Sequence, residues 1–173
     1  MKLLPGDIVF ERSESRLGRA IRWFTRRPGE PETWANHVGL VLKPGWIIEA
    51  LWSVVISRFV PGPSFEVWRM RDLAPVQRVA ITDWASLYKD RRYGLLKIIA
   101  HAVDAFITKL RGREAYLIRR FCRMDRYPIC SWLVAWSYLK GAGIEFGVRP
   151  EFASPDDIHD FVKRKGSGWF RVV

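Results

Sequence analysis

The first seventy residues alternate short apolar runs with turn-forming residues, a pattern typical of β-strands joined by tight turns. Strands are expected at 5–11 (PGDIVFE), 37–42 (HVGLVL), 46–59 (WIIEALWSVVISRF, one or two strands) and 65–70 (FEVWRM). Between the first two, apolar residues at helical spacing predict a helix over 15–25, and Pro and Gly break the chain at 26–33. This succession of strands predicts an antiparallel sheet.

The pattern changes to a helical period after residue 74. Helices are expected at 74–90, 95–110, 113–124, 130–140 and 154–165. The first places five apolar side chains on one face: Val76, Val79, Ala80, Trp84 and Leu87. Segment 130–140 (CSWLVAWSYLK) is apolar on nearly every side, which is typical of a central buried helix, and Gly141 is expected to end it. Ser154 begins the last helix as its N-cap, and His159 is expected to be exposed in its first turn.

The order of strands first and helices after predicts an α+β fold, with a small antiparallel sheet packed against the central helix at 130–140. The 173 residues contain no repeat, low-complexity tract or long linker. A single domain over 1–173 is therefore expected, with 95–124 as a variable helical elaboration.

Charge and hydropathy narrow the choice of partner. The chain has 29 basic and 18 acidic residues, and its net charge of +11 favours an anionic lipid surface, an acidic polymer or nucleic acid; the alternative is a merely solvated basic face. Nucleic acid is the weakest candidate because the basic residues are spread along the chain and no nucleic-acid motif is present. Neither a signal peptide nor a membrane span is expected, so a cytoplasmic location is predicted unless other machinery exports the protein.

Cys130 is the candidate nucleophile. A thiol at the start of a helix feels the positive end of the helix dipole, which lowers its pKa, and the backbone N–H groups of the first turn can stabilise an oxyanion. The alternatives are a small core residue and a disulfide to Cys122. Neither cysteine has a companion at metal-ligand spacing, so no metal and no cofactor is expected.

His37 and Glu49 are the candidate base and orienting group. His37 opens a buried strand beside Gly39, which leaves room next to it, and Glu49 is a lone carboxylate within an apolar run. If the two strands form a hairpin around Pro44, the even offset puts both side chains on the same side. With Cys130 they would form a nucleophile, base and orienter. The alternatives are a His satisfied at a strand end and a Glu that faces water.

Six segments in order resemble the circularly permuted branch of the NlpC/P60 papain-like superfamily, which includes YiiX-type and lecithin:retinol acyltransferase-like proteins. They are PGDIVFE, NHVGLVL, WIIEAL, RRYG, CSWLVAWSYLKGAG and SPDDI. The resemblance spans residues 5–160 apart from 95–124, and His37 precedes Cys130 as in that branch. It implies a papain-like fold in which Cys130, His37 and Glu49 match the catalytic residues and Tyr93 lines the site.

Further candidates for lining the substrate or oxyanion site are Ser131, Trp132 and Asn36. Trp132 stands where many relatives have an acidic residue. The expected function is that of a thiol hydrolase or acyltransferase, acting on a peptide amide of cell-wall type or a lipid acyl group through a thioester. The Arg and Trp content favours an anionic membrane surface. The alternative is a non-catalytic basic binding module on the same fold, with affinity that falls steeply with salt.

Overall fold

The computed structural model describes residues 2–25, 33–94, 103–104, 106–107, 111 and 128–173. Its strands are β1 (Ile8–Glu11), β2 (His37–Lys43), β3 (Trp46–Ala50), β4 (Val54–Arg58), β5 (Phe65–Met70) and β6 (Trp169–Arg171). Its helices are α1 (Arg16–Thr25), α2 (Pro75–Ser86), α4 (Cys130–Ala142) and α5 (Pro155–Lys163). The helices expected at 95–110 and 113–124, together with Cys122, lie outside the described residues.

The strands form one antiparallel sheet in the order β4-β3-β2-β1-β5-β6. The predicted α+β class and antiparallel sheet are therefore confirmed, and 46–59 contains two strands, β3 and β4. The edge strand β6 was not predicted, because three residues are too short to show an alternating pattern. Within the described ranges, no helix combines the length and apolarity that crossing a membrane requires.

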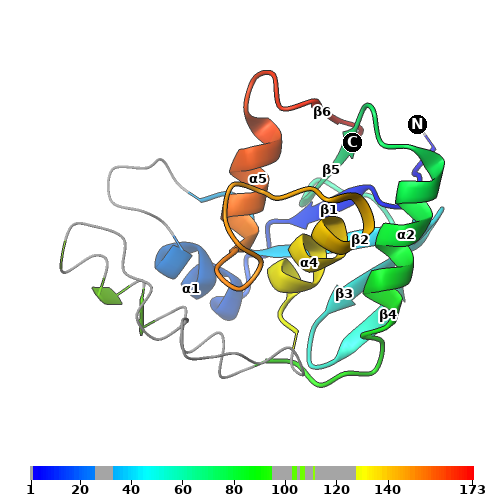
Figure 1. The fold of residues 1–173 in the computed structure, drawn as a ribbon. Helices are drawn as coiled ribbons and strands as arrows, with labels where there is room; N and C mark the ends of the chain where they lie inside the picture. Colours follow the sequence, from blue (N-terminus) through cyan, green and yellow to red (C-terminus); the bar gives the residue numbers. More distant parts are fainter. Residues whose placement is uncertain (1, 26–32, 95–102, 105, 108–110, 112–127) are drawn as a thin grey trace.

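Helix α4 lies against one face of the sheet, between α2 and α5 (Figure 1). Its residues Leu133 and Tyr138 are fully buried in the same cluster as Ile8, Leu40 and Ile48 of the sheet. A second apolar cluster covers the opposite face: Leu3, Val9, Val41, Ile47, Phe59 and Val67. The central strands are buried on both faces, which accounts for the nearly continuous apolar run of β2. The predicted burial of α4 is confirmed.

The end of α4 differs from the prediction. The helix continues to Ala142 and ends at Gly143, which adopts the left-handed conformation at φ 69°. Gly141 lies inside the helix, where a Cβ atom would be 2.5 Å from the backbone nitrogen of Ile81 in α2. Gly141 is therefore required for the close approach of two helices, and it does not end the helix.

This close approach also determines which face of α2 is buried. Ile81, Thr82 and Ala85 face inward, whereas Val76 and Val79 are 73% and 55% exposed. The apolar face predicted from the periodicity is thus largely on the surface. Because Gly141 has no side chain, α2 approaches it closely through Ile81, and this contact leaves the two valines on the surface.

His159 is buried at 1% exposure, so its expected surface position was wrong. Its Nε2 donates to Glu66 Oε2 at 2.9 Å, and its ring stacks on Trp34 with centroids 5.2 Å apart. The helix start was predicted well, since Ser154 and Asp157 form a capping box. A capped first turn shows where a helix begins but not which side faces the sheet.

Candidate active site

The hairpin of β2 and β3 brings His37 and Glu49 to one side of the sheet. Glu49 is paired with Gly39, two residues after His37, so both side chains leave the same face. This register depends on a β-bulge between Val41 and Lys43. If the pairing continued from Lys43 and Trp46 without the bulge, Glu49 would lie opposite Leu40 and its side chain would leave the other face of the sheet. The pairing predicted around Pro44 is the one observed.

Gly39 lets the Glu49 carboxylate reach across the strand. A Cβ atom at Gly39 would lie 3.1 Å from the carbonyl oxygen of Ile48 and 3.3 Å from Glu49 Cβ. Without that atom, Glu49 Oε2 accepts a hydrogen bond from His37 Nε2 at 2.8 Å. The room that the sequence predicted beside His37 is occupied by its carboxylate partner.

Ser57 on β4 completes the surroundings of Glu49. Its hydroxyl donates to Glu49 Oε1, so both carboxylate oxygens are hydrogen-bonded. Burial opposes the charge of Glu49, but the hydrogen bonds from His37 and Ser57 lower the pKa of this carboxyl below its ordinary value. Glu49 is therefore an ionised, fixed acceptor. Ser57 was not identified from the sequence. Its alternation with Ile56 indicates that Ser57 lies on one face of β4, but only the pairing of β4 with β3 shows that this is the face of Glu49.

Cys130 is the first residue of α4 and is 6% exposed. The preceding residue, Ile129, has an extended backbone and offers no side-chain cap, so the amides of the first turn are left for other acceptors. The Cys130 sulfur accepts hydrogen bonds from the backbone N–H groups of Ser131 and Val38, and it is hydrogen-bonded to His37. Cys130 is a free thiol.

The electrostatics of the pair favour a thiolate and an imidazolium. Burial opposes both charges, but each group stabilises the other. The Cys130 thiolate and its hydrogen bond, together with Glu49, raise the pKa of His37 to about 10. The His37 charge and hydrogen bond, together with the amides of Val38 and Ser131, lower the pKa of the Cys130 thiol. Since Nε2 of His37 donates to Glu49, Nδ1 is the nitrogen left to face Cys130.

Tyr93 is a further partner of the thiol. Its hydroxyl is hydrogen-bonded to both the side chain and the backbone N–H of Cys130. Burial, followed by the nearby thiolate, raises the pKa of Tyr93 above its ordinary value, so this hydroxyl keeps its proton. Two backbone hydrogen bonds hold the segment in place: Tyr93 N donates to Trp52 O at 3.0 Å, and Gly94 N donates to Pro128 O at 3.1 Å.

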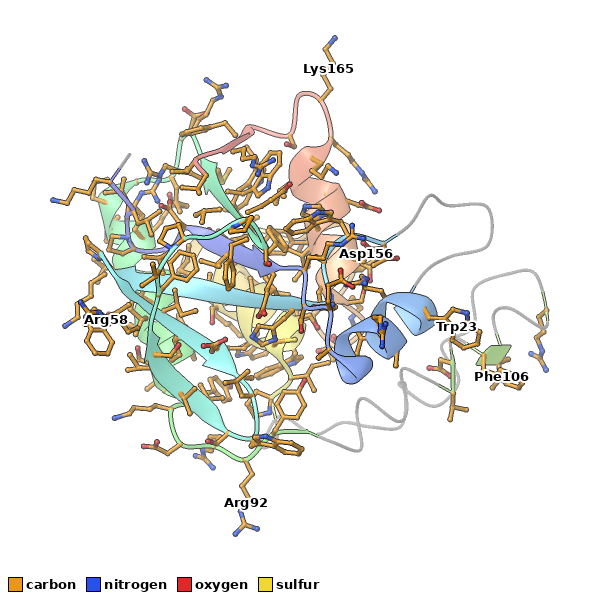
Figure 2. All side chains as sticks on the ribbon, turned by 180° about the vertical axis from the view of Figure 1, so that it is seen from behind. Trp23, Arg58, Arg92, Phe106, Asp156 and Lys165 are labelled. Carbon is orange, nitrogen blue, oxygen red and sulfur yellow. The ribbon has the colours of Figure 1, made fainter. Side chains whose placement is uncertain are left out.

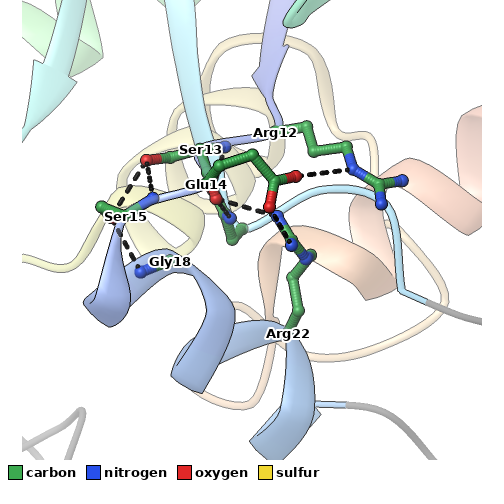
Figure 3. A network of polar contacts seen from close by, with 7 residues as sticks. Arg12, Ser13, Glu14, Ser15, Gly18 and Arg22 are labelled. Carbon is green, nitrogen blue, oxygen red and sulfur yellow. Dashed lines mark hydrogen bonds and ion pairs between the residues drawn. The ribbon is translucent and has the colours of Figure 1, made fainter.

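Asn36 supports the site as a scaffold residue. Its side-chain amide donates to Ser13 O at 2.7 Å and accepts from Ser13 N at 3.0 Å. Ser13 belongs to a larger network, in which the buried Arg22 donates to Ser13 O and to the Glu14 carboxylate (Figure 3). Both ends of the Asn36 amide are thus engaged, and they fix the chain immediately before His37.

Ser131 and Trp132 are also engaged away from the thiol. The Ser131 hydroxyl donates to Ala153 O at 2.6 Å, so only the backbone amide of this residue faces Cys130. Trp132 is 1% exposed and packs between two rings, with centroids 5.1 Å from Tyr88 and 5.4 Å from Trp136. Of the predicted residues, the structure brings together Cys130, His37, Glu49 and Tyr93 by their side chains.

The comparisons with known proteins concern the fold. No family model and no curated protein matches the sequence. One solved structure that matches is described as metalloprotein YiiX, DUF1105, from Escherichia coli O157:H7. It has a TM-score of 0.67 and 17% sequence identity, and the alignment covers 100% of this chain and 98% of that chain. At this identity the match shows a shared α+β fold, in line with the YiiX-type resemblance of the sequence.

That protein is described as a metalloprotein, and the described residues of this chain offer one candidate set of metal ligands. One group of three candidates has ligand atoms within 4.8 Å of one another: Asp156, His159 and Asp160 on α5. His159 Nε2 is already bound to Glu66, and Asp156 Oδ2 accepts from Thr33 at 3.0 Å. These bonds engage one nitrogen of His159 and one oxygen of Asp156 in holding α5 on the rest of the fold. Two of the three side chains thus serve the packing of α5, which makes the set a poor fit for a metal centre.

Proposed function

We propose that the protein is a thiol hydrolase or acyltransferase with a circularly permuted papain-like fold. It acts on an amide or ester bond through Cys130, His37 and Glu49. The observation that carries the proposal is the continuous hydrogen-bond chain from Ser57 through Glu49 and His37 to a thiol at the start of a buried helix. Such a chain supplies a nucleophile, a base and an orienting group.

The reaction begins with the ion pair. The Cys130 thiolate attacks the carbonyl carbon, and the negative charge moves to the carbonyl oxygen. The Cys130 backbone N–H and the protonated Tyr93 hydroxyl both lie at the thiol and are placed to donate to that oxygen. As the carbon–nitrogen or carbon–oxygen bond breaks, the imidazolium of His37 gives its proton to the leaving amine or alcohol. The acyl group then remains on Cys130 as a thioester.

The second half reverses the proton transfer. His37, now neutral, takes a proton from water or from an acceptor amine or alcohol while that molecule attacks the thioester. The carbon–sulfur bond breaks, and the ion pair of Cys130 and His37 is restored. Glu49 holds the ring through Nε2 in both halves, so Nδ1 stays aimed at the sulfur. Water gives hydrolysis, and another acceptor gives acyl transfer.

The test uses a p-nitrophenyl ester as a general acyl donor, in a Cys122→Ser background. We expect Cys130 to gain the mass of the acyl group, to release it with hydroxylamine as a thioester does, and to lose this labelling in Cys130→Ala. His37→Ala should slow acylation, whereas His159→Ala, which removes another His that is hydrogen-bonded to a glutamate, should leave its rate close to that of the parent. Acylation that persists in Cys130→Ala would overturn the proposal, as would a Cys130 that reacts with iodoacetamide no faster than a free thiol.

A further inference from the structure

A small amphiphilic surface adjoins the candidate active site. Leu51 and Trp52, in the turn between β3 and β4, are 47% and 80% exposed. Arg91 and Arg92 are exposed directly beside them, since Arg92 forms a β-bridge with Ser53 and Val54 N donates to Arg91 O at 2.9 Å. These four residues are called the Trp52 rim. Large apolar side chains that remain in water next to cations mark a surface for a partner.

The two arginines of the rim are not paired within the part of the chain that the structure describes. Neither guanidinium group of Arg91 and Arg92 forms an ion pair or hydrogen bond with another described residue. The turn also carries Lys89 and one acid, Asp90, so its three cations exceed its acids by two. A partner that matches the rim therefore offers negative charge together with an apolar layer.

The rim is joined to the thiol through one residue. Tyr93 follows Arg92 in the chain, its backbone N–H donates to Trp52 O at 3.0 Å, and its hydroxyl is hydrogen-bonded to Cys130. Whatever binds the rim is thus next to the candidate nucleophile. Figure 2 shows Arg92 extending from one end of the molecule, whereas Lys165 extends from the opposite end.

We propose that the Trp52 rim docks the protein on an anionic phospholipid surface. Trp52 and Leu51 enter the headgroup region, and Arg91 and Arg92 bind lipid phosphates at its level. Docking presents Cys130 to an amide or ester held at that surface. This last step rests on the proposed function, but the docking itself does not, because it requires no reaction at the thiol.

The test measures sedimentation of the Cys130→Ala protein with phosphatidylcholine vesicles, with and without phosphatidylglycerol, at low and high salt. We expect binding only to the anionic vesicles and a loss of binding at high salt. Trp52→Ala should weaken it about tenfold, and Arg91→Ala and Arg92→Ala about fivefold each. Trp23→Ala and Lys165→Ala, which remove an exposed Trp and an exposed cation elsewhere, are the matched controls and should change little.

Two results would overturn the docking proposal. One is binding to the anionic vesicles that the three rim variants leave unchanged. The other is equally tight binding to heparin that depends on the two Arg residues but not on Trp52, which would identify a soluble polyanion. The outcomes also separate the two proposals. Vesicle binding without any acylation of Cys130 in the parent protein would leave the docking and remove the enzyme, and acylation without vesicle binding would do the reverse.

Discussion

Replacing Glu49 by Gln tests how much the buried carboxylate contributes to the thiolate. The amide has the same shape and can still accept from His37 Nε2, but it carries no charge. Losing the carboxylate lowers the pKa of His37, and a less stable imidazolium in turn raises the pKa of Cys130. A hydrogen bond to a charged group is worth about 1.5–3 kcal/mol. We therefore expect kcat/KM to fall by about 10- to 100-fold.

The direct assay is the pH dependence of Cys130 alkylation by iodoacetamide, followed by peptide mass spectrometry. In the parent protein the thiolate should react well below the ordinary thiol pKa, and in Glu49→Gln the midpoint should move to higher pH. Glu66→Gln is the matched control, since Glu66 is also a buried carboxylate hydrogen-bonded to a His but lies in another part of the fold. An unchanged midpoint in Glu49→Gln would refute the reasoning.

Three further changes probe separate parts of the fold. Tyr93→Phe removes the hydroxyl at the thiol, and kcat should fall about tenfold with KM nearly unchanged; an unaffected kcat would argue against oxyanion stabilisation. Gly141→Ala should lower the free energy of unfolding in urea by about 1–3 kcal/mol, because its Cβ meets Ile81, and full stability would contradict the close helix contact. Burial lowers the pKa of His159 in the folded protein, so as the pH falls the unfolded chain protonates this His first and the free energy of unfolding decreases. In urea unfolding between pH 7.5 and 5, His159→Gln should lose less of this free energy than the parent protein does.

The sequence predicts the parts of the site that depend on local pattern. A hairpin centred on Pro44 gives His37 and Glu49 an even offset and so places them on one side, and the apolar run from Cys130 onward indicates where α4 begins. The sequence does not reveal the bulge before Lys43, although that bulge is needed for the register. Ser57 was missed for a related reason, because its role depends on which strand pairs with β3.

Other differences arise from packing between distant segments. Trp132 was considered a substrate-lining residue because it stands where many relatives have an acidic residue. A helix places this position about 200° around its axis from Cys130, and here the side chain packs on Tyr88 and Trp136. The apolar face of α2 was assigned from periodicity, but Gly141 selects another face. Periodicity alone does not identify the neighbour that a face will contact.

The described residues include two hydrogen-bonded Glu–His pairs, and their comparison shows what distinguishes the candidate site. His37 and His159 each donate through Nε2 to a carboxylate, at 2.8 and 2.9 Å. Burial opposes protonation of both rings, yet the pKa of His37 is raised and that of His159 is lowered. The difference lies in the second neighbour: His37 faces a thiol that can become an anion, whereas His159 is enclosed by Phe10 and two Trp rings. A carboxylate alone therefore does not keep a buried imidazole charged in this fold, and the charge on His37 depends on its pairing with Cys130.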